Sequence, residues 1–163
     1  MKNRIRLEKF EKQEEFCYIA QLVFNEKVMN MNFGRTFTQE EAEGYYAHIL
    51  EYNHVHENAG CYKVFLENDN SFIGIGSLWA EEDETEVDYM VLSEYWNHGY
   101  ATEIVGMLVD IAKLNPSVGK ISGLMDPANI PSKKVLIKNG FSFEKTMNVE
   151  EDNSVVEIYS MKI

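Results

Sequence analysis

A short run of the chain, WNHGYATEIVGML at 96–108, joins a small flexible loop to an apolar helical pattern. Gly99 has no Cβ, so the chain can turn tightly there and a ligand can approach the backbone closely. Apolar residues then recur at offsets of three and four, which predicts a helix over about 100–114. The first N–H groups of a helix lack intrahelical partners and carry partial positive charge. The junction therefore suits either an anion such as phosphate or a plain helix start.

Two acidic side chains precede this junction in the segment TEVDYMV. The two-residue period of a strand places Glu86 and Asp88 on the same face. A carboxylate with a raised pKa can accept a proton from a reacting group. The pair therefore indicates either an acid–base site or two polar residues on a solvated strand face.

The remaining reactive residues favour no metal or redox site. Cys17 and Cys61 have neither metal-binding nor redox spacing and are interpreted as buried free thiols. His54, His56 and Glu57 share one short polar stretch and could resemble a metal cluster. A solvated loop is favoured there, because the three residues lie in one polar stretch with no apolar segment around them to form a metal site.

The composition limits the classes of function. The 163 residues are 45% hydrophobic, which suits a single domain over 1–163. The 15 basic and 27 acidic residues give a net charge of −12, which disfavours nucleic acid and favours cationic substrates or serves solubility alone. The sequence has no apolar run near the ~20 residues that span a bilayer and no signal-peptide pattern at its start. We therefore expect a cytoplasmic protein without a membrane partner.

The elements that must position these residues follow from hydrophobic periodicity. Strands are predicted over about 3–10, 60–67, 71–80, 86–92, 120–125, 141–149 and 154–163. Helices are predicted over about 16–24, 38–52, 100–114 and 131–139. The second begins with Thr38 followed three residues later by Glu41, a capping-box pattern. The predicted order is βααβββαβαββ, a mixed-sheet α+β fold.

With the elements in this order, the chain resembles the GNAT superfamily of acyl-CoA-dependent N-acyltransferases, and within it the ribosomal-protein N-acetyltransferase-like branch. The run YWNHGYATE is similar to the branch's YWGKGYATE, with Trp96 where the superfamily signature has Gln or Arg. The run NIPSKKVLIKNGF resembles a second landmark, Asn, two residues, Ser or Ala, and a helix ending in Gly-Phe. Two spaced motifs in the right order are more specific than either alone. The resemblance implies a twisted central sheet that splays near Val91 at an acyl-CoA slot.

The resemblance also implies which residues bind acetyl-CoA: Val91, Leu92, Asn97, His98, Gly99, Tyr100, Ala101, Thr102, Asn129, Ser132 and Lys134. Backbone N–H groups of 97–102 would cradle the pyrophosphate, and Val91 and Leu92 would offer main-chain hydrogen bonds to the pantetheine arm. Asn129 and Ser132 would contact the arm from the other side, unless they only cap a helix.

The catalytic roles are implied less completely. Lys133 and Lys134 could supply positive charge near a phosphate or be ordinary solvated helix lysines. Glu86 aligns with a strand glutamate that some members use as the base, so it is predicted to accept the proton while Asp88 orients the amine. Leu136 stands where many members have a Tyr as general acid, so that role stays unassigned.

The function implied by this resemblance is an acetyl-CoA-dependent N-acetyltransferase that acts on a primary amine by direct transfer in a ternary complex, without a metal. The amine could belong to a protein N-terminus or to a small molecule, and the two N-terminal helices would build its pocket. The alternative is a non-catalytic acyl-CoA-binding or regulatory module. The protein is expected to be a monomer or a homodimer.

Overall fold

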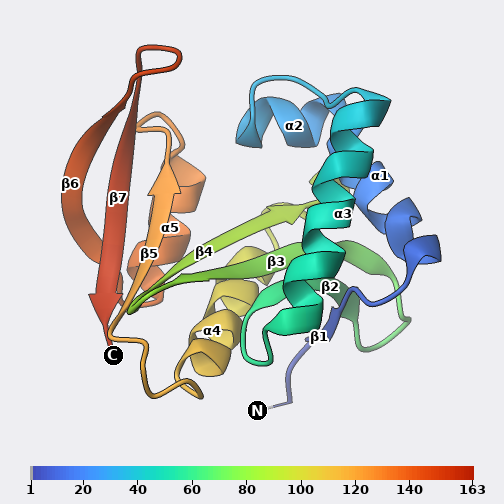
Figure 1. Cartoon of the computed structure of the whole chain (residues 1–163), viewed down its shortest axis with the longest axis horizontal. Helices are drawn as coiled ribbons and strands as arrows, with labels where there is room; N and C mark the ends of the chain where they lie inside the picture. Colours follow the sequence, from blue (N-terminus) through green and yellow to red (C-terminus); the bar gives the residue numbers. More distant parts are fainter. Residues whose placement is uncertain (1) are drawn as a thin grey trace.

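The computed structural model of the chain describes residues 2–163. Within these residues it contains one seven-stranded sheet with the order β1-β2-β3-β4-β5-β7-β6 (Figure 1). The strands are β1 (Ile5–Lys9), β2 (Gly60–Leu66), β3 (Phe72–Glu81), β4 (Glu84–Val91), β5 (Lys120–Met125), β6 (Ser142–Val149) and β7 (Ser154–Lys162). Only the β4–β5 pair is parallel among the described strands. The predicted mixed α+β fold is confirmed.

The helices lie on both faces of the sheet. They are α1 (Phe16–Val23), α2 (Glu26–Asn32), α3 (Gln39–Val55), α4 (Tyr100–Ala112) and α5 (Ile130–Lys138). Figure 1 shows α1–α3 together on one side of β1–β4, α4 on the other side, and α5 beside β5. Each face has its own buried apolar cluster. The β4 strand therefore separates two cores, and its alternate side chains face different helices.

The N-terminal helices differ in one respect from the prediction. The capping box at the start of α3 is present, because the Thr38 hydroxyl accepts from the Glu41 N–H and the Glu41 carboxylate accepts from the Thr38 N–H. The segment between the two predicted helices, however, forms the additional helix α2. Asn25 starts it as an N-cap, accepting from the Val28 N–H at 3.2 Å. The observed order is therefore βαααβββαβαββ.

The splay of the sheet begins earlier along β4 than the resemblance implied. Strand β4 pairs with β5 only at Glu84, Thr85 and Glu86, whereas its pairing with β3 continues to Val91. Figure 1 shows β4 and β5 starting side by side and then running apart. The separation thus starts directly after Glu86 rather than near Val91, because β5 leaves together with β7 while β4 stays with β3.

The two cysteines lie in different environments. Cys61 is buried, as predicted, but Cys17 is exposed. The buried residues of α1 are Ile19, Leu22 and Val23, and Cys17 lies away from that stripe. The prediction of two buried thiols is therefore wrong for Cys17.

The histidine-containing segment is the end of a helix and not the predicted solvated loop. Helix α3 continues to Val55, so it includes His54, and His56 is its C-cap. The ring of His56 stacks on Tyr52 with centroids 3.8 Å apart. Among residues 2–163, no group of three His, Cys, Asp or Glu side chains is arranged to hold a metal ion. In the same residues, no helix combines the length and apolar character needed to cross a membrane.

Candidate active site

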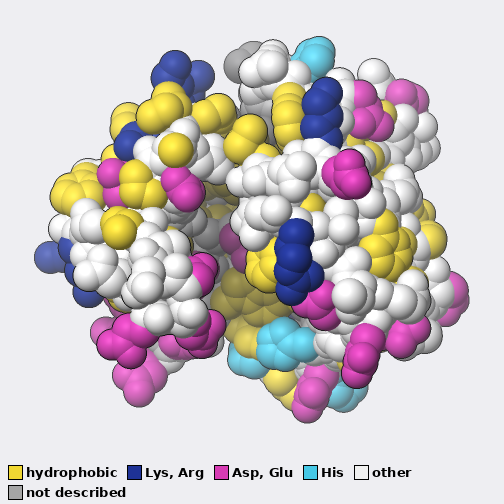
Figure 2. All heavy atoms as spheres, turned by 90° about the horizontal axis from the view of Figure 1, so that it is seen from above, with side chains coloured by type: hydrophobic (Ala, Val, Ile, Leu, Met, Phe, Trp, Pro, Cys, Tyr) yellow, Lys and Arg dark blue, Asp and Glu magenta, His cyan; other side chains and the backbone are white. Residues whose placement is uncertain are grey.

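Two cavities adjoin where β4 leaves β5. The first, named here the α4 cavity, has a volume of about 460 Å³ and lies between the start of α4 and α5. The second, the Asp88 cavity, has a volume of about 350 Å³ and lies between α2, α3 and the ends of β4 and β5. Both are lined by Met31, Asn32, Tyr89, Met90, Asn129 and Ser132. In Figure 2 a hollow separates the part of the molecule formed by β5–β7 from the part formed by α1–α3.

The loop before α4 and the first turn of that helix present to the first cavity backbone N–H groups that suit an anion. Asn97 and Gly99 have φ values of 63° and 82°, in the left-handed region, and Gly99 is the N-cap of α4. The Glu103 N–H donates to the Gly99 carbonyl at 3.2 Å and begins the helical hydrogen-bond pattern. The preceding N–H groups of Tyr100, Ala101 and Thr102 have no intrahelical partner, and these residues line the cavity. Such a helix start attracts anionic groups.

Positive charge reaches this cavity from α5. Lys134 and Lys138 both line it. Lys133 does not, because its ammonium lies 3.0 Å from the Glu157 carboxylate. Lys138 was missed by the sequence analysis, although its spacing of four residues from Lys134 places both on one helix face.

Arg4, which directly precedes β1, holds the same loop from outside the cavity. Its Nε and backbone N–H donate to the two carboxylate oxygens of Glu103 at 2.9 and 2.8 Å. Its Nη1 donates to the His98 carbonyl at 3.0 Å, and its guanidinium lies 4.5 Å from the centre of the Tyr100 ring. The arginine therefore offsets a carboxylate in the first turn of α4, where negative charge opposes an incoming anion.

Most residues implied as cofactor contacts line the α4 cavity: Val91, Asn97, Gly99, Tyr100, Ala101, Thr102, Asn129, Ser132 and Lys134. Leu92 and His98 are not among its lining residues. The Leu92 N–H donates to the Ile73 carbonyl at 2.8 Å, and its carbonyl accepts from the Tyr95 N–H at 3.0 Å. Leu92 thus has both main-chain groups engaged within the protein.

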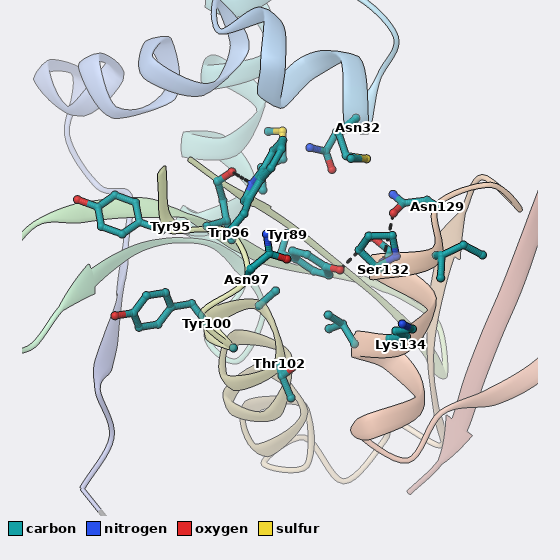
Figure 3. A pocket seen from close by; sticks show the side chains of 18 of the residues that line it. Asn32, Tyr89, Tyr95, Trp96, Asn97, Tyr100, Thr102, Asn129, Ser132 and Lys134 are labelled. Carbon is teal, nitrogen blue, oxygen red and sulfur yellow. Dashed lines mark hydrogen bonds between the residues drawn. The ribbon is translucent and has the colours of Figure 1, made fainter. Parts of the chain in front are cut away.

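Trp96 forms a hydrogen bond with the backbone of Val91, a residue that the resemblance assigns as a contact of the pantetheine arm. Its indole N–H donates to the Val91 carbonyl at 2.7 Å, as drawn in Figure 3. One lone pair of that carbonyl is therefore occupied. Since Leu92 pairs with β3, the alternation of a strand directs the main-chain groups of Val91 toward the open side of β4.

A pair of hydroxyl groups lies on the wall that the two cavities share. The Tyr89 hydroxyl donates to Ser132 Oγ at 3.0 Å across the space between β4 and α5 (Figure 3). Burial raises the pKa of Tyr89, and the hydrogen bond to Ser132 partly offsets that rise. Asn129 is the N-cap of α5 and accepts from the Ser132 N–H at 3.2 Å, so the helix-cap role is present together with the cavity lining.

Leu136 contributes only apolar surface to the Asp88 cavity. Its side chain is 4% exposed and packs against β5, where a Cβ on Gly123 would lie 2.8 Å from Leu136 Cδ1. Leu136 cannot donate a proton, whereas the hydroxyls of Tyr89 and Ser132, which line the same cavity, can do so. Nothing local to β4 in the sequence indicates that Tyr89 reaches α5, so its contact with Ser132 could not be predicted.

The two strand acids occupy different places although they share a face. Asp88 lines the Asp88 cavity and accepts a hydrogen bond from the Trp79 indole at 3.0 Å. Burial raises the pKa of Asp88, and the Trp79 hydrogen bond partly offsets the rise. Burial, and next the neighbouring charge of Asp88, also raise the pKa of Glu86. Glu86, however, lines neither cavity.

Comparison with known proteins relates most of the chain to one family. Residues 4–142 match the family model of the acetyltransferase (GNAT) domain. The uncharacterised protein YkkB of Bacillus subtilis (strain 168) is 24% identical over 167 residues, covering 98% of this chain and 93% of YkkB.

Solved structures share the fold over nearly the whole chain. A ribosomal L7/L12 alpha-N-protein acetyltransferase, RimL, in complex with coenzyme A has a TM-score of 0.83 at 17% identity, covering 99% of this chain and 96% of that one. A spermidine N-acetyltransferase from Vibrio cholerae, in complex with CoA and spermine, has a TM-score of 0.80 at 16% identity, covering 98% and 95%.

Proposed function

Because this chain belongs to the GNAT acetyltransferase family, we propose that it transfers an acetyl group from acetyl-CoA directly to a primary amine, with both substrates bound at once. The observation that carries this proposal is the wall shared by the two cavities. An anion-binding cavity and a carboxylate-lined cavity meet at Tyr89 and Ser132, so two ligands bound there would touch at that point. Holding two reactants in contact is the main requirement of a direct transfer.

The α4 cavity fits coenzyme A in charge and shape. The free N–H groups at the start of α4 suit the pyrophosphate, and Lys134 and Lys138 add positive charge to a protein of net charge −12. The open side of β4 at Val91 offers main-chain groups to an extended pantetheine arm. The RimL and Vibrio cholerae structures, which have the same fold, contain coenzyme A.

The Asp88 cavity fits a cationic acceptor. Acetyl-CoA supplies the electrophilic thioester carbon and a thiol leaving group. Asp88 binds the ammonium, accepts one of its protons, and leaves a neutral nitrogen that forms the new C–N bond as the C–S bond breaks. We assign the base to Asp88 rather than to Glu86, because only Asp88 lines the cavity.

The departing sulfur meets the two hydroxyls of the shared wall. Since Tyr89 donates its proton to Ser132 Oγ, the Ser132 hydroxyl proton is free to point toward another acceptor. Ser132 can give that proton to the thiolate and regain one from Tyr89. This pair supplies the proton that a tyrosine in place of Leu136 would otherwise provide. The second proton that the nitrogen loses as the amide forms restores the Tyr89 hydroxyl, and Asp88 releases its proton to solvent after the product leaves.

The second candidate, an acyl-CoA-binding regulatory module, draws its support from the apolar, buried Leu136. One experiment separates the two. The purified protein is incubated with acetyl-CoA and a broad panel of primary amines, and thiol release and product mass are measured. We expect thiol release that depends on both substrates. Binding of acetyl-CoA in a calorimeter without thiol release for any amine would instead support the regulatory module.

A further inference from the structure

We propose that the acceptor is an amine joined to an apolar group, and that the Asp88 cavity selects such monoamines over polycationic amines. This inference rests on the proposed function and refines it. It follows from the side chains that line the cavity, which provide one deep carboxylate and a long apolar wall.

The charges of the cavity suit a single ammonium group. Among the described residues that line it, the carboxylates are Asp88 and Asp126, and none is Lys, Arg or His. Asp126 is exposed at the end of β5, and its Oδ1 already accepts from the Ala128 N–H at 2.7 Å. Glu41, at the start of α3, is held by Arg35 in a two-point contact. Of the two carboxylates that line the cavity, Asp88 is therefore the one that lies away from its exposed end.

An aromatic row runs along one wall. Phe33 and Phe37 lie edge to face with centroids 5.0 Å apart, and Phe37 and Tyr45 do the same at 5.8 Å. Phe33 is 55% exposed, whereas burial raises the pKa of Tyr45, which is close enough to Asp88 to feel its charge. The row thus leads from the surface toward Asp88. Aromatic rings offer a large apolar contact surface to a ligand.

Flexible apolar side chains complete the wall: Met29, Met31, Met90, Met125, Val87, Leu124 and Leu136. Methionine adapts to ligands of different shape, because its side chain is unbranched and polarisable. The second carboxylate of the described lining, Asp126, lies at the exposed end of β5, so a further ammonium of a polyamine would either stay at that exposed end or lie against the apolar wall, where a buried charge without a partner is costly. An alkyl or aromatic group would instead gain from being removed from water.

Straight-chain amines from ethylamine to hexylamine provide the test, because their ammonium groups have nearly the same pKa and differ only in apolar length. The kcat/KM for thiol release is measured at saturating acetyl-CoA. We expect a rise of about fourfold per methylene until the cavity is filled, with hexylamine above putrescine and spermidine. A flat series, or a higher kcat/KM for the polyamines, would overturn the inference and leave the proposed function intact. Absence of thiol release with every amine tested would contradict the proposed function itself.

A pair of matched variants locates the selectivity. Phe37→Ala removes the central ring of the row, so we expect the increase per methylene to fall to about twofold or less. Phe24→Ala is the control, because Phe24 is 40% exposed and lines neither cavity. An unchanged series in Phe37→Ala would place the apolar contact elsewhere and contradict the proposal.

The same chemistry occurs in an amino terminus that bears an apolar side chain. The tripeptides Leu-Gly-Gly and Gly-Gly-Gly are therefore compared with hexylamine. A higher kcat/KM for the leucine peptide than for hexylamine supports a peptide as the source of the ammonium and the apolar group, and the reverse order supports a free amine. A preference for the glycine peptide over the leucine peptide would contradict the inference.

Discussion

The indole nitrogen of Trp79 donates a hydrogen bond to Asp88 Oδ2 at 3.0 Å. Trp79 lies on β3 opposite Glu86, and Asp88 lies two residues further along β4, so the bond joins a diagonal pair on one face of the sheet. Burial raises the pKa of Asp88, and this bond counteracts the rise. Trp79 therefore helps to set the pH at which Asp88 ionises.

Trp79→Phe should move the acidic limb of the pH–rate profile to higher pH. Asp88 must be ionised to bind and deprotonate the amine, so kcat/KM falls as the pH drops through the pKa of Asp88. Without the indole donor that pKa rises further. Trp96→Phe is the control, because its indole donates to the Val91 carbonyl instead. An acidic limb that stays in place in Trp79→Phe would show that Asp88 does not control it.

Asp88→Asn and Glu86→Gln separate the two strand acids. We expect Asp88→Asn to lower kcat by about 10²-fold or more near neutral pH, because it removes the proton acceptor while keeping the shape of the side chain. Glu86→Gln should change kcat only a few-fold. The reverse pattern would return the base to Glu86, the assignment implied by the family resemblance.

Asp88→Asn should also stabilise the fold at neutral pH. Burial raises the pKa of Asp88 in the folded protein above its value in the unfolded chain. The contribution of this group to the free energy of unfolding is therefore fully present below the pKa of the unfolded chain. It is lost as the pH rises through the pKa of the folded protein. Asparagine does not ionise, so Asp88→Asn avoids this loss of stability at neutral pH. Thermal unfolding should give a higher Tm for Asp88→Asn at pH 7, with the difference shrinking as the pH is lowered. A constant difference at all pH values would contradict the buried-charge explanation.

Gly99→Ala and Gly140→Ala form a matched pair for the anion site. Both glycines have left-handed φ values, 82° and 92°, so each substitution should cost about 1–2 kcal/mol of folding free energy. Only Gly99 lines the α4 cavity. We expect about tenfold weaker binding of acetyl-CoA by calorimetry for Gly99→Ala, equivalent to ~1.4 kcal/mol, and little change for Gly140→Ala. Equal affinities in the two variants would contradict a pyrophosphate site at Gly99.

A double-mutant cycle tests the contact between Arg4 and Glu103. Arg4→Ala leaves the Glu103 carboxylate unbalanced at the start of α4, and we expect about fivefold weaker acetyl-CoA binding, equivalent to ~1 kcal/mol. Glu103→Gln alone should bind acetyl-CoA at least as tightly as the unmodified protein, because Arg4 then adds an unbalanced positive charge. The double variant should recover most of the affinity, since the opposing charge is gone. If it stays as weak as Arg4→Ala, the arginine acts through the His98 carbonyl and not through charge.

Local patterns in the sequence predicted the strands, the helices α1, α3, α4 and α5, and part of the site. The start of α3 at Thr38 and the start of α4 at Gly99 depend on hydrogen bonds and dihedral angles within a few residues. The shared face of Glu86 and Asp88 follows from the period of a strand. Helix α2 escaped prediction, because only seven residues support it and Asn25 is its main signal.

Only the tertiary structure decided which of these residues meet. Tyr89 and Ser132 are 43 residues apart, and Arg4 and Glu103 are 99 apart, so no local pattern connects them. The point at which β4 and β5 separate depends on how β5 pairs with β7, and that separation opens the space beyond Glu86. Asp88 consequently lines a cavity and Glu86 does not, because two residues on one strand face reach different surroundings once the neighbouring strand has moved away.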